Sequence, residues 1–334
     1  MATPQFDILG IGNAIVDVLV AVDDSVLAQH ALNKGSMALV DAATATAMLA
    51  AVPAGVECSG GSAANTLVGL AALGVRTAYI GKVASDRLGG VFSKGMVDVG
   101  VAFDTPAGPA EPPTAQCLVL VTPDAQRTMQ TFLGACVELG PDDVPEALVQ
   151  DAAITYLEGY LWDRPAAKDA FRKAAKVAHA AGRRVSLTLS DPFCVGRHRA
   201  EFLDLAENHV DILFANEAEL ISLYEAESFD AALARVPRSA GKITVVTRGA
   251  LGSVVIDATS TTAVPAEPIA KVVDTTGAGD LYAAGFLYGL TRGLDMRGCA
   301  RAGGIAAAEA ISHFGARPQA PLLPLVESAL AAKA

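Results

Sequence analysis

In the second half of the chain, short apolar runs rich in β-branched residues alternate with longer stretches of helical spacing. The runs that predict strands lie at 153–158, 183–190, 210–215, 242–247 and 252–257. The stretches that predict helices lie at 166–182, 278–293 and 296–312. Such alternation is typical of a mostly parallel sheet flanked by helices, so we expect an α/β, Rossmann-like core.

The first half adds β segments that do not follow this alternation. Residues 15–23 are β-branched without a helical face, and 116–132 predict a hairpin with Pro123 and Asp124 in its turn. A helix is expected between them, at 60–74. We therefore predict one domain over 1–334, with a small β-sheet lid. Its segments, near 14–40 and 100–135, are inserted in the α/β core.

Composition narrows the function classes. The chain has 334 residues, is 52% hydrophobic and carries a net charge of −11, so it can bury a large core and lacks the basic balance of a nucleic-acid binder. Its five cysteines are widely spaced, which argues against a disulfide framework or zinc site. The N-terminus lacks the features of a signal peptide, and no apolar run reaches the roughly 18 residues of a membrane span. We expect a cytoplasmic protein without a membrane or nucleic-acid partner.

Polar or glycine residues follow most of the predicted strands in the second half. They are Gly159-Tyr160, Asp191-Pro192-Phe193, Asn216 to Glu219, and Arg248-Gly249. In open α/β sheets, ligands bind in the crevice outside the carboxyl ends of the strands. Any one polar loop is ordinary, but together they predict one shared site. Tyr160, Trp162 and Phe193 could clamp a flat ligand there or simply pack in the core.

The stretch DTTGAGDLYAAGFL (274–287) contains one candidate centre of chemistry. Gly277, Ala278 and Gly279 precede a helix, so their N–H groups lack intrahelical partners and form an anion hole. Asp280 lies in the first turn, where we expect an ionised carboxylate able to act as a general base. The structural alternative is that Asp280 caps the helix. Because Thr275 and Thr276 are available as caps, the helix does not need Asp280 for that purpose.

The same stretch resembles the C-terminal motif of the ribokinase-like (PfkB) family of sugar and nucleoside kinases. GIGNAIVDV (10–18), GGSAANTLVGLAALG (60–74), NEAE (216–219) and VTRGALGSVV (246–255) match further family segments in the family's order. The resemblance implies catalytic roles for Asp280 and the Gly277–Gly279 amides. The residues implied in substrate binding are Asn13, Asp17, Gly60, Gly61, Asn65 and Arg127. Those implied in ATP binding are Asn216, Thr247, Gly249, Gly252, Gly277 and Gly279, with Asn216 and Glu219 reaching Mg²⁺ through water.

Within the family, the chain is most similar to adenosine kinases, through VDILFANEAE, LTLSDPF and LEGYLWD. The resemblance implies ATP- and Mg²⁺-dependent phosphorylation of the 5′-hydroxyl of a purine nucleoside, with adenosine as the first choice. A sugar kinase of the same family is the alternative. A dependence on a monovalent cation, and the choice between monomer and homodimer, stay open.

Two readings from other classes compete with the kinase. GIGNAI (10–15) is a near match to the dinucleotide fingerprint, which would indicate an oxidoreductase, but a β-branched run follows where that fingerprint requires a helix. A ligand-binding regulator without catalysis would not need Asp280. A P-loop kinase is excluded because no G-x-x-x-x-G-K-[ST] occurs.

Overall fold

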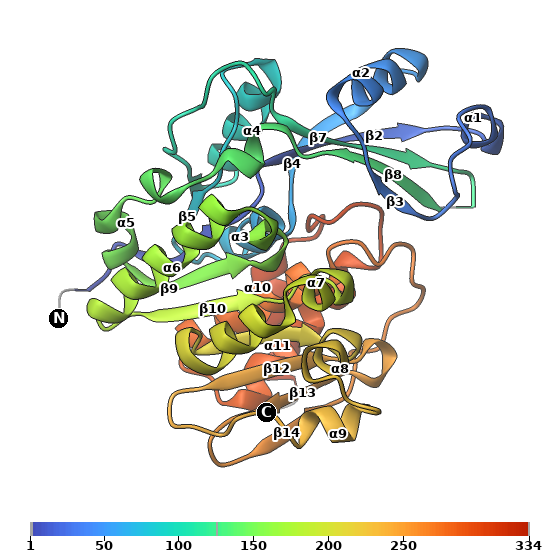
Figure 1. Ribbon diagram of the computed structural model, residues 1–334. Coiled ribbons are helices and arrows are strands. Elements are labelled where there is room, and N and C mark those ends of the chain that lie inside the picture. Colours follow the sequence, from blue (N-terminus) through green and yellow to red (C-terminus); the bar gives the residue numbers. More distant parts are fainter. Residues whose placement is uncertain (1–2, 125, 333–334) are drawn as a thin grey trace.

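A nine-stranded sheet runs through the larger part of the molecule in the computed structural model, which describes residues 3–124 and 126–332 (Figure 1). In spatial order its strands are β14 (Thr261–Val264), β13 (Ser253–Ile256), β12 (Ile243–Thr247), β11 (Ile212–Asn216), β10 (Arg184–Thr188), β9 (Ala152–Glu158), β1 (Phe6–Ile11), β5 (Thr77–Ile80) and β6 (Val101–Ala102). Neighbours from β12 to β6 are parallel, and only β12–β13 and β13–β14 are antiparallel. The predicted mostly parallel α/β sheet is confirmed.

The alternation of side chains along each strand builds a core on both faces of this sheet. On β11, Phe214 points to one face and Leu213 to the other, as the period of two requires. The first face is covered by α3 (Ser62–Ala72), α10 (Ala278–Thr291), α11 (Met296–Ala310) and α12 (Leu322–Ala331). The second is covered by α5 (Glu146–Gln150), α6 (Pro165–Ala180), α7 (Pro192–Asp204), α8 (Glu217–Tyr224) and α9 (Phe229–Leu233).

A second, five-stranded sheet projects from one end of the large sheet (Figure 1). Its order is β3 (Met37–Leu39), β8 (Arg127–Phe132), β7 (Ala115–Val121), β2 (Ile15–Ala21) and β4 (Val56–Gly60). The predicted hairpin is present, because β7 and β8 pair antiparallel. Two details differ from the predicted segments: β4 lies outside both of them, and β6 lies within 100–135 but belongs to the large sheet. Whether the second sheet moves as a lid stays a prediction.

Helices connect the strands of the first half. They are α1 (Asp24–Gln29), α2 (Ala42–Ala51) and α4 (Arg87–Val97), together with α3. Residue 15 begins strand β2, so the helix that a dinucleotide fingerprint needs after GIGNAI does not form. The oxidoreductase reading therefore loses its structural support.

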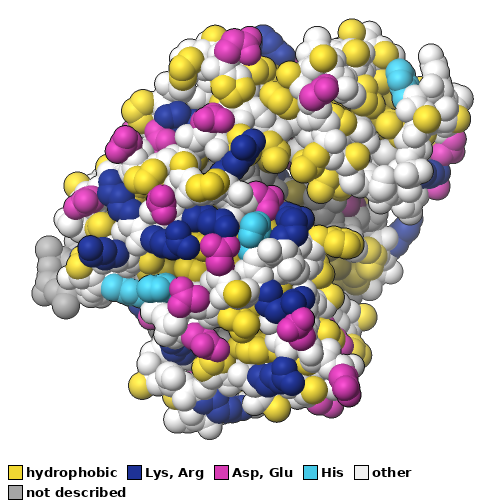
Figure 2. All heavy atoms as spheres, in the orientation of Figure 1, with side chains coloured by type: hydrophobic (Ala, Val, Ile, Leu, Met, Phe, Trp, Pro, Cys, Tyr) yellow, Lys and Arg dark blue, Asp and Glu magenta, His cyan; other side chains and the backbone are white. Residues whose placement is uncertain are grey.

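The surface mixes both signs of charge. Figure 2 shows basic and acidic side chains side by side over the face that carries α6 and α7, where Lys168 pairs with Glu201 and Arg197 with Asp163. The same view shows the surface hollowed between the part that carries the second sheet and the part below it. Among residues 3–124 and 126–332, no helix combines the length and apolar character needed to cross a bilayer.

Candidate active site

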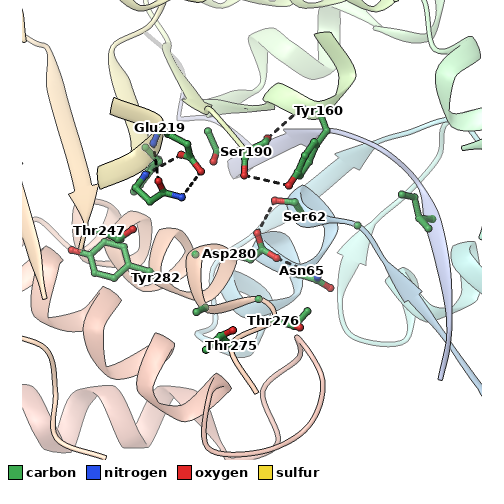
Figure 3. Close-up of a pocket in the computed structure, with 18 of the residues that line it drawn as sticks. Ser62, Asn65, Tyr160, Ser190, Glu219, Thr247, Thr275, Thr276, Asp280 and Tyr282 are labelled. Atoms are coloured by element: carbon green, nitrogen blue, oxygen red, sulfur yellow. Dashed lines mark hydrogen bonds between the residues drawn. The ribbon is translucent and has the colours of Figure 1, made fainter. Parts of the chain in front are cut away.

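A pocket of about 490 Å³ lies where the carboxyl ends of the large-sheet strands face the second sheet (Figure 3). Tyr160, Ser190, Asn216 and Thr247 enter it just after or at the ends of β9, β10, β11 and β12. The four strand ends thus border one pocket, although Asp191, Pro192, Phe193, Arg248 and Gly249 do not line it. That the pocket is a ligand site stays a prediction. The volume is within the roughly 300–1,000 Å³ that small-molecule sites occupy.

Asp280 faces this pocket from the first turn of α10. Its Oδ1 accepts a hydrogen bond from Ser62 Oγ at 2.6 Å and its Oδ2 one from Asn65 Nδ2 at 3.3 Å (Figure 3). Burial raises the pKa of Asp280 to about 6, while the hydrogen bonds from Ser62 and Asn65 act to lower it. The carboxylate is therefore ionised at neutral pH, as expected, but with a pKa above the ordinary value. A carboxylate in this state can accept a proton from a nearby alcohol.

The turn before α10 supplies main-chain donors. Gly277 is the N-cap with φ +75°, and an added Cβ there would lie 2.6 Å from the Cβ of Ala316, so only glycine fits. Ala278 N already donates to Thr275 O at 3.2 Å, so this amide is less free than predicted. Gly279 N, in the first turn, has no intrahelical acceptor. Thr275 and Thr276, which the sequence makes available as caps, are not used as caps, because α10 has no side-chain cap and both threonines line the pocket.

Asp17 enters the pocket from the middle of the second sheet. Its strand, β2, is flanked by β4 and β7, which places Asp17 opposite Cys58 and Cys117 rather than on an edge. Gly60 makes room for it, since an added Cβ would lie 2.3 Å from Asp17 Oδ2. Burial raises the pKa of Asp17 to about 6; Arg317 and Arg127 oppose this shift, and the charge of Asp280 adds to it.

Asn216 and Glu219 join strand β11 to helix α8. Asn216 Oδ1 accepts from Glu219 N at 2.8 Å, and the Glu219 carboxylate accepts from Asn216 N at 2.9 Å and from Asn216 Nδ2 at 2.6 Å. Burial raises the pKa of Glu219 to about 7. Both side chains line the pocket. Within the described part of the chain, no cluster of three His, Cys, Asp or Glu side chains could hold a metal ion by itself.

Several residues predicted to bind ligands do not line this pocket. They are Asn13, Gly60, Arg127, Gly249 and Gly252. Arg127 forms a buried ion pair with Asp274 at 2.7 Å, and Asn13 Nδ2 donates to Glu158 at 2.7 Å. Their contacts with ligands stay predictions. Gly61, Asn65 and Thr247, in contrast, line the pocket together with Asp17 and Asp280.

The aromatic residues separate into three environments. Trp162 is 1% exposed and packs between Phe171 and Phe202, so it belongs to the core rather than to a clamp. Phe193 is 80% exposed, and Tyr160 lines the pocket, where its hydroxyl donates to Ser190 O at 3.3 Å.

Sequence reasoning missed several pocket residues. Ser62, Cys117, Ser190 and Tyr282 all line the cavity. Ser62 follows Gly60-Gly61 at a helix opening, a signal that could have identified it. Cys117 becomes a neighbour of Asp17 only through strand register, which the sequence does not show.

Together, the parallel sheet with its second small sheet, the glycine-rich helix opening and the pocket carboxylates Asp17 and Asp280 define a ribokinase-like small-molecule kinase. The chain belongs to the family described as pfkB family carbohydrate kinase, which it matches over residues 28–322. It is accordingly a phosphotransferase with an alcohol acceptor, and that family implies the use of ATP.

Solved structures and curated relatives agree with this assignment. The structure of adenosine kinase from Sinorhizobium meliloti is 48% identical, with a TM-score of 0.88 over 97% of this chain and 99% of that one. That of a probable sugar kinase protein from Rhizobium etli CFN 42 is 45% identical, with a TM-score of 0.89 over 98% and 99%. Adenosine kinase of Saccharomyces cerevisiae is 28% identical over 330 residues, which cover 91% of this chain and 94% of that protein.

The two glycines of the helix opening give a matched pair for testing its geometry. We expect Gly277→Ala to lower stability by about 1–3 kcal/mol, because it combines a positive φ with overlap against Ala316. Gly279→Ala places its methyl in open space and should stay within about 1 kcal/mol of the parent. Urea unfolding of both variants checks this, and equal stabilities would contradict the role assigned to Gly277.

Proposed function

We propose that this protein transfers the γ-phosphoryl group of ATP to the 5′-hydroxyl of a purine nucleoside, with adenosine as the substrate. The observation that carries the proposal is the Asp280 carboxylate, which faces the pocket beside the first amides of α10. The 48% identity to an adenosine kinase over nearly the whole chain supports adenosine as the acceptor.

In the proposed reaction, Asp280 orients the 5′-hydroxyl and accepts its proton. The freed oxygen attacks the γ-phosphorus while the bond from that phosphorus to the β–γ bridging oxygen breaks, so ADP leaves with the electron pair. The amides of Gly277, Ala278 and Gly279 stabilise the negative charge on the transferred group, with Gly279 as the donor least engaged elsewhere.

Asp17 binds the sugar in this proposal. An ionised carboxylate is an acceptor-only group, and its two oxygens suit the two neighbouring hydroxyls of a ribose. Gly60 leaves the space in which that carboxylate lies, and Gly61 and Asn65 border the same part of the pocket. Asn13 supports the sugar-binding part of the pocket from outside it, through the hydrogen bond that its side chain donates to Glu158.

The nucleotide would lie along the ends of β11 and β12. Thr247 and Asn216 line that part of the pocket, with Gly249 and Gly252 in the loop beyond it. Both oxygens of Glu219 already accept hydrogen bonds from Asn216, which fits contact with Mg²⁺ through water rather than directly. When bound, Mg²⁺ neutralises charge on the phosphates.

Arg127 contributes through closure of the second sheet in this proposal. Its guanidinium is held by Asp274, the residue just before the glycine-rich turn, and does not reach the pocket. For Arg127 to contact the transferred phosphoryl group, its ion pair with Asp274 must break as the sheet closes, and a new ion pair with the phosphate must form.

A sugar kinase is the second candidate, because a probable sugar kinase protein matches the chain with 45% identity. Assays with ATP and Mg²⁺ should compare adenosine, inosine, guanosine, cytidine, ribose and fructose by kcat/KM. We expect adenosine to be preferred. A preference for the free sugars would reject the nucleoside, and no turnover with any acceptor would reject the whole proposal.

Asp280→Asn should bind ATP but lower kcat by about 10²–10⁴-fold, the range for loss of a general base. In the parent, kcat/KM should fall as the pH drops through about 6, because Asp280 and Asp17 both become protonated there and the base is lost. A pH–rate profile checks the second statement. Retention of most turnover in Asp280→Asn would contradict the assigned role.

Asp17→Asn should mainly raise KM for the nucleoside, by roughly 10–100-fold, because one acceptor oxygen becomes a donor facing a hydroxyl. KM for ATP should not change. Glu57→Gln is the matched control: it removes a carboxylate from the same sheet that pairs with Arg87 at the surface. Equal KM values in the two variants would mean that Asp17 does not contact the acceptor.

A further inference from the structure

Glu158, the last residue of β9, is a buried carboxylate to which the reaction above assigns no role. It is 1% exposed and does not line the pocket. Its Oε1 accepts from Asn13 Nδ2 at 2.7 Å and from Asn13 N at 3.4 Å, and its Oε2 accepts from Ala63 N at 2.8 Å. Both oxygens thus face N–H donors, an environment that suits an ionised carboxylate and not an amide.

The first turn of α3 lies between this carboxylate and Asp280. Glu158 holds the main chain of the turn at Ala63 N, while the flanking side chains of Ser62 and Asn65 donate to Asp280. The turn has little freedom on the Glu158 side, because Gly61 has φ +98° and an added Cβ there would lie 2.3 Å from Asn13 O. A shift of Glu158 would therefore be transmitted to the two donors of Asp280.

We propose that Glu158 is a positioning residue that fixes the opening of α3, so that Ser62 and Asn65 hold Asp280 in its reactive orientation and protonation state. It acts through α3 and touches neither acceptor nor ATP. The proposal deepens the function proposed above and rests on it only for the kinetic readout.

Other titratable groups surround this pair of carboxylates. Asp17 on β2 faces Asp280, and Tyr79 on β5, Tyr156 on β9 and Cys136 interact with Glu158. Burial raises the pKa of both tyrosines and of Cys136 above their ordinary values, so these three stay neutral between pH 5 and roughly 8. Burial also raises the pKa of Glu158 to about 7, against the hydrogen bonds from Ala63 and Asn13. The carboxylates around the pocket that titrate in this range are Asp17, Glu158, Asp280 and Glu219.

The direction of the expected effect follows from the hydrogen bonds. The bonds from Ser62 and Asn65 lower the pKa of Asp280. Glu158 also repels the charge of Asp280, so a neutral substitute would by itself lower the pKa of Asp280. Glu158→Asp keeps the charge, but its shorter side chain cannot reach both Ala63 N and Asn13, so one contact is lost and the α3 turn loosens. Weaker donation to Asp280 raises its pKa, and the acid limb of the kcat profile moves to higher pH. A residue that only stabilised the fold would not move that limb.

The test compares pH profiles of kcat for the parent, Glu158→Asp, Ser62→Ala and the double variant. Because small displacements of reacting groups are costly, we expect Glu158→Asp to lower kcat by about 10–100-fold and to move the acid limb upward. Ser62→Ala should move it in the same direction. The double variant should lose less than the two single losses combined, since part of the effect of Glu158 passes through Ser62.

Asp211→Asn is the matched control. Its carboxylate also accepts a main-chain N–H, from Val185 at 2.7 Å, but at the amino ends of β10 and β11, and it should leave the kcat profile unchanged. Additive losses in the double variant, or an unmoved acid limb in Glu158→Asp, would overturn the proposal. Glu158→Gln, which loses both a contact and the charge, should also lower kcat, with its acid limb at lower pH than that of Glu158→Asp.

A second readout separates this inference from the proposed function. Carboxyl ¹³C NMR of the ligand-free protein, with the Asp280 signal assigned from Asp280→Asn, gives the pKa of Asp280 directly. If the parent phosphorylates none of the acceptors, the proposed function fails. A raised pKa of Asp280 in Glu158→Asp would still support the positioning role, and an unchanged value would reject it.

Discussion

The site depends on keeping one buried carboxylate charged. Removal from water disfavours the anion, and for Asp280 this raises the pKa to about 6. Two donors from α3 and the opening of α10 work in the other direction. The resulting balance leaves a carboxylate that is more basic than a free aspartate yet ionised at neutral pH. A general base needs both properties, and neither burial nor hydrogen bonding alone provides them.

The second sheet adds to the cost of keeping Asp280 ionised, because it brings a second carboxylate, that of Asp17, into the same pocket. Asp17 and Asp280 repel each other, and Arg127 and Arg317 offset part of that repulsion around Asp17. Arg127 is itself tied to Asp274, at the start of the glycine-rich stretch. This ion pair joins strand β8 of the second sheet to the loop that precedes α10. It therefore connects the part of the pocket near Asp17 with the part near the helix opening.

The features of this arrangement that the sequence could predict are those that depend on local patterns of residues. Alternating apolar runs gave the parallel strands, and Gly-Ala-Gly before a charge-free helix gave the opening with Asp280. Strand β4 was missed because VECSG is short and polar, and Cys117 because its contact with Asp17 arises from register. Glu158 resembled an ordinary strand end, and Trp162 was equally suited to clamp or core. For these residues, burial and long-range neighbours decide the role, and a single sequence contains neither.

The lining around Asp17 also bears on the choice between nucleoside and free sugar. Next to the carboxylate that suits a diol, the second sheet contributes Ile15, Cys117 and Met129, and Tyr160 lines the same pocket from the part that carries the large sheet. A free sugar presents hydroxyls in every direction and would leave this apolar surface unmatched, at a cost in desolvation without compensating contact. A nucleoside presents hydroxyls on one side and a flat base, with weakly polar ring faces and polar edges, on the other. A pocket lined by a carboxylate, apolar side chains and the hydroxyls of Thr131 and Ser190 suits the nucleoside proposed above.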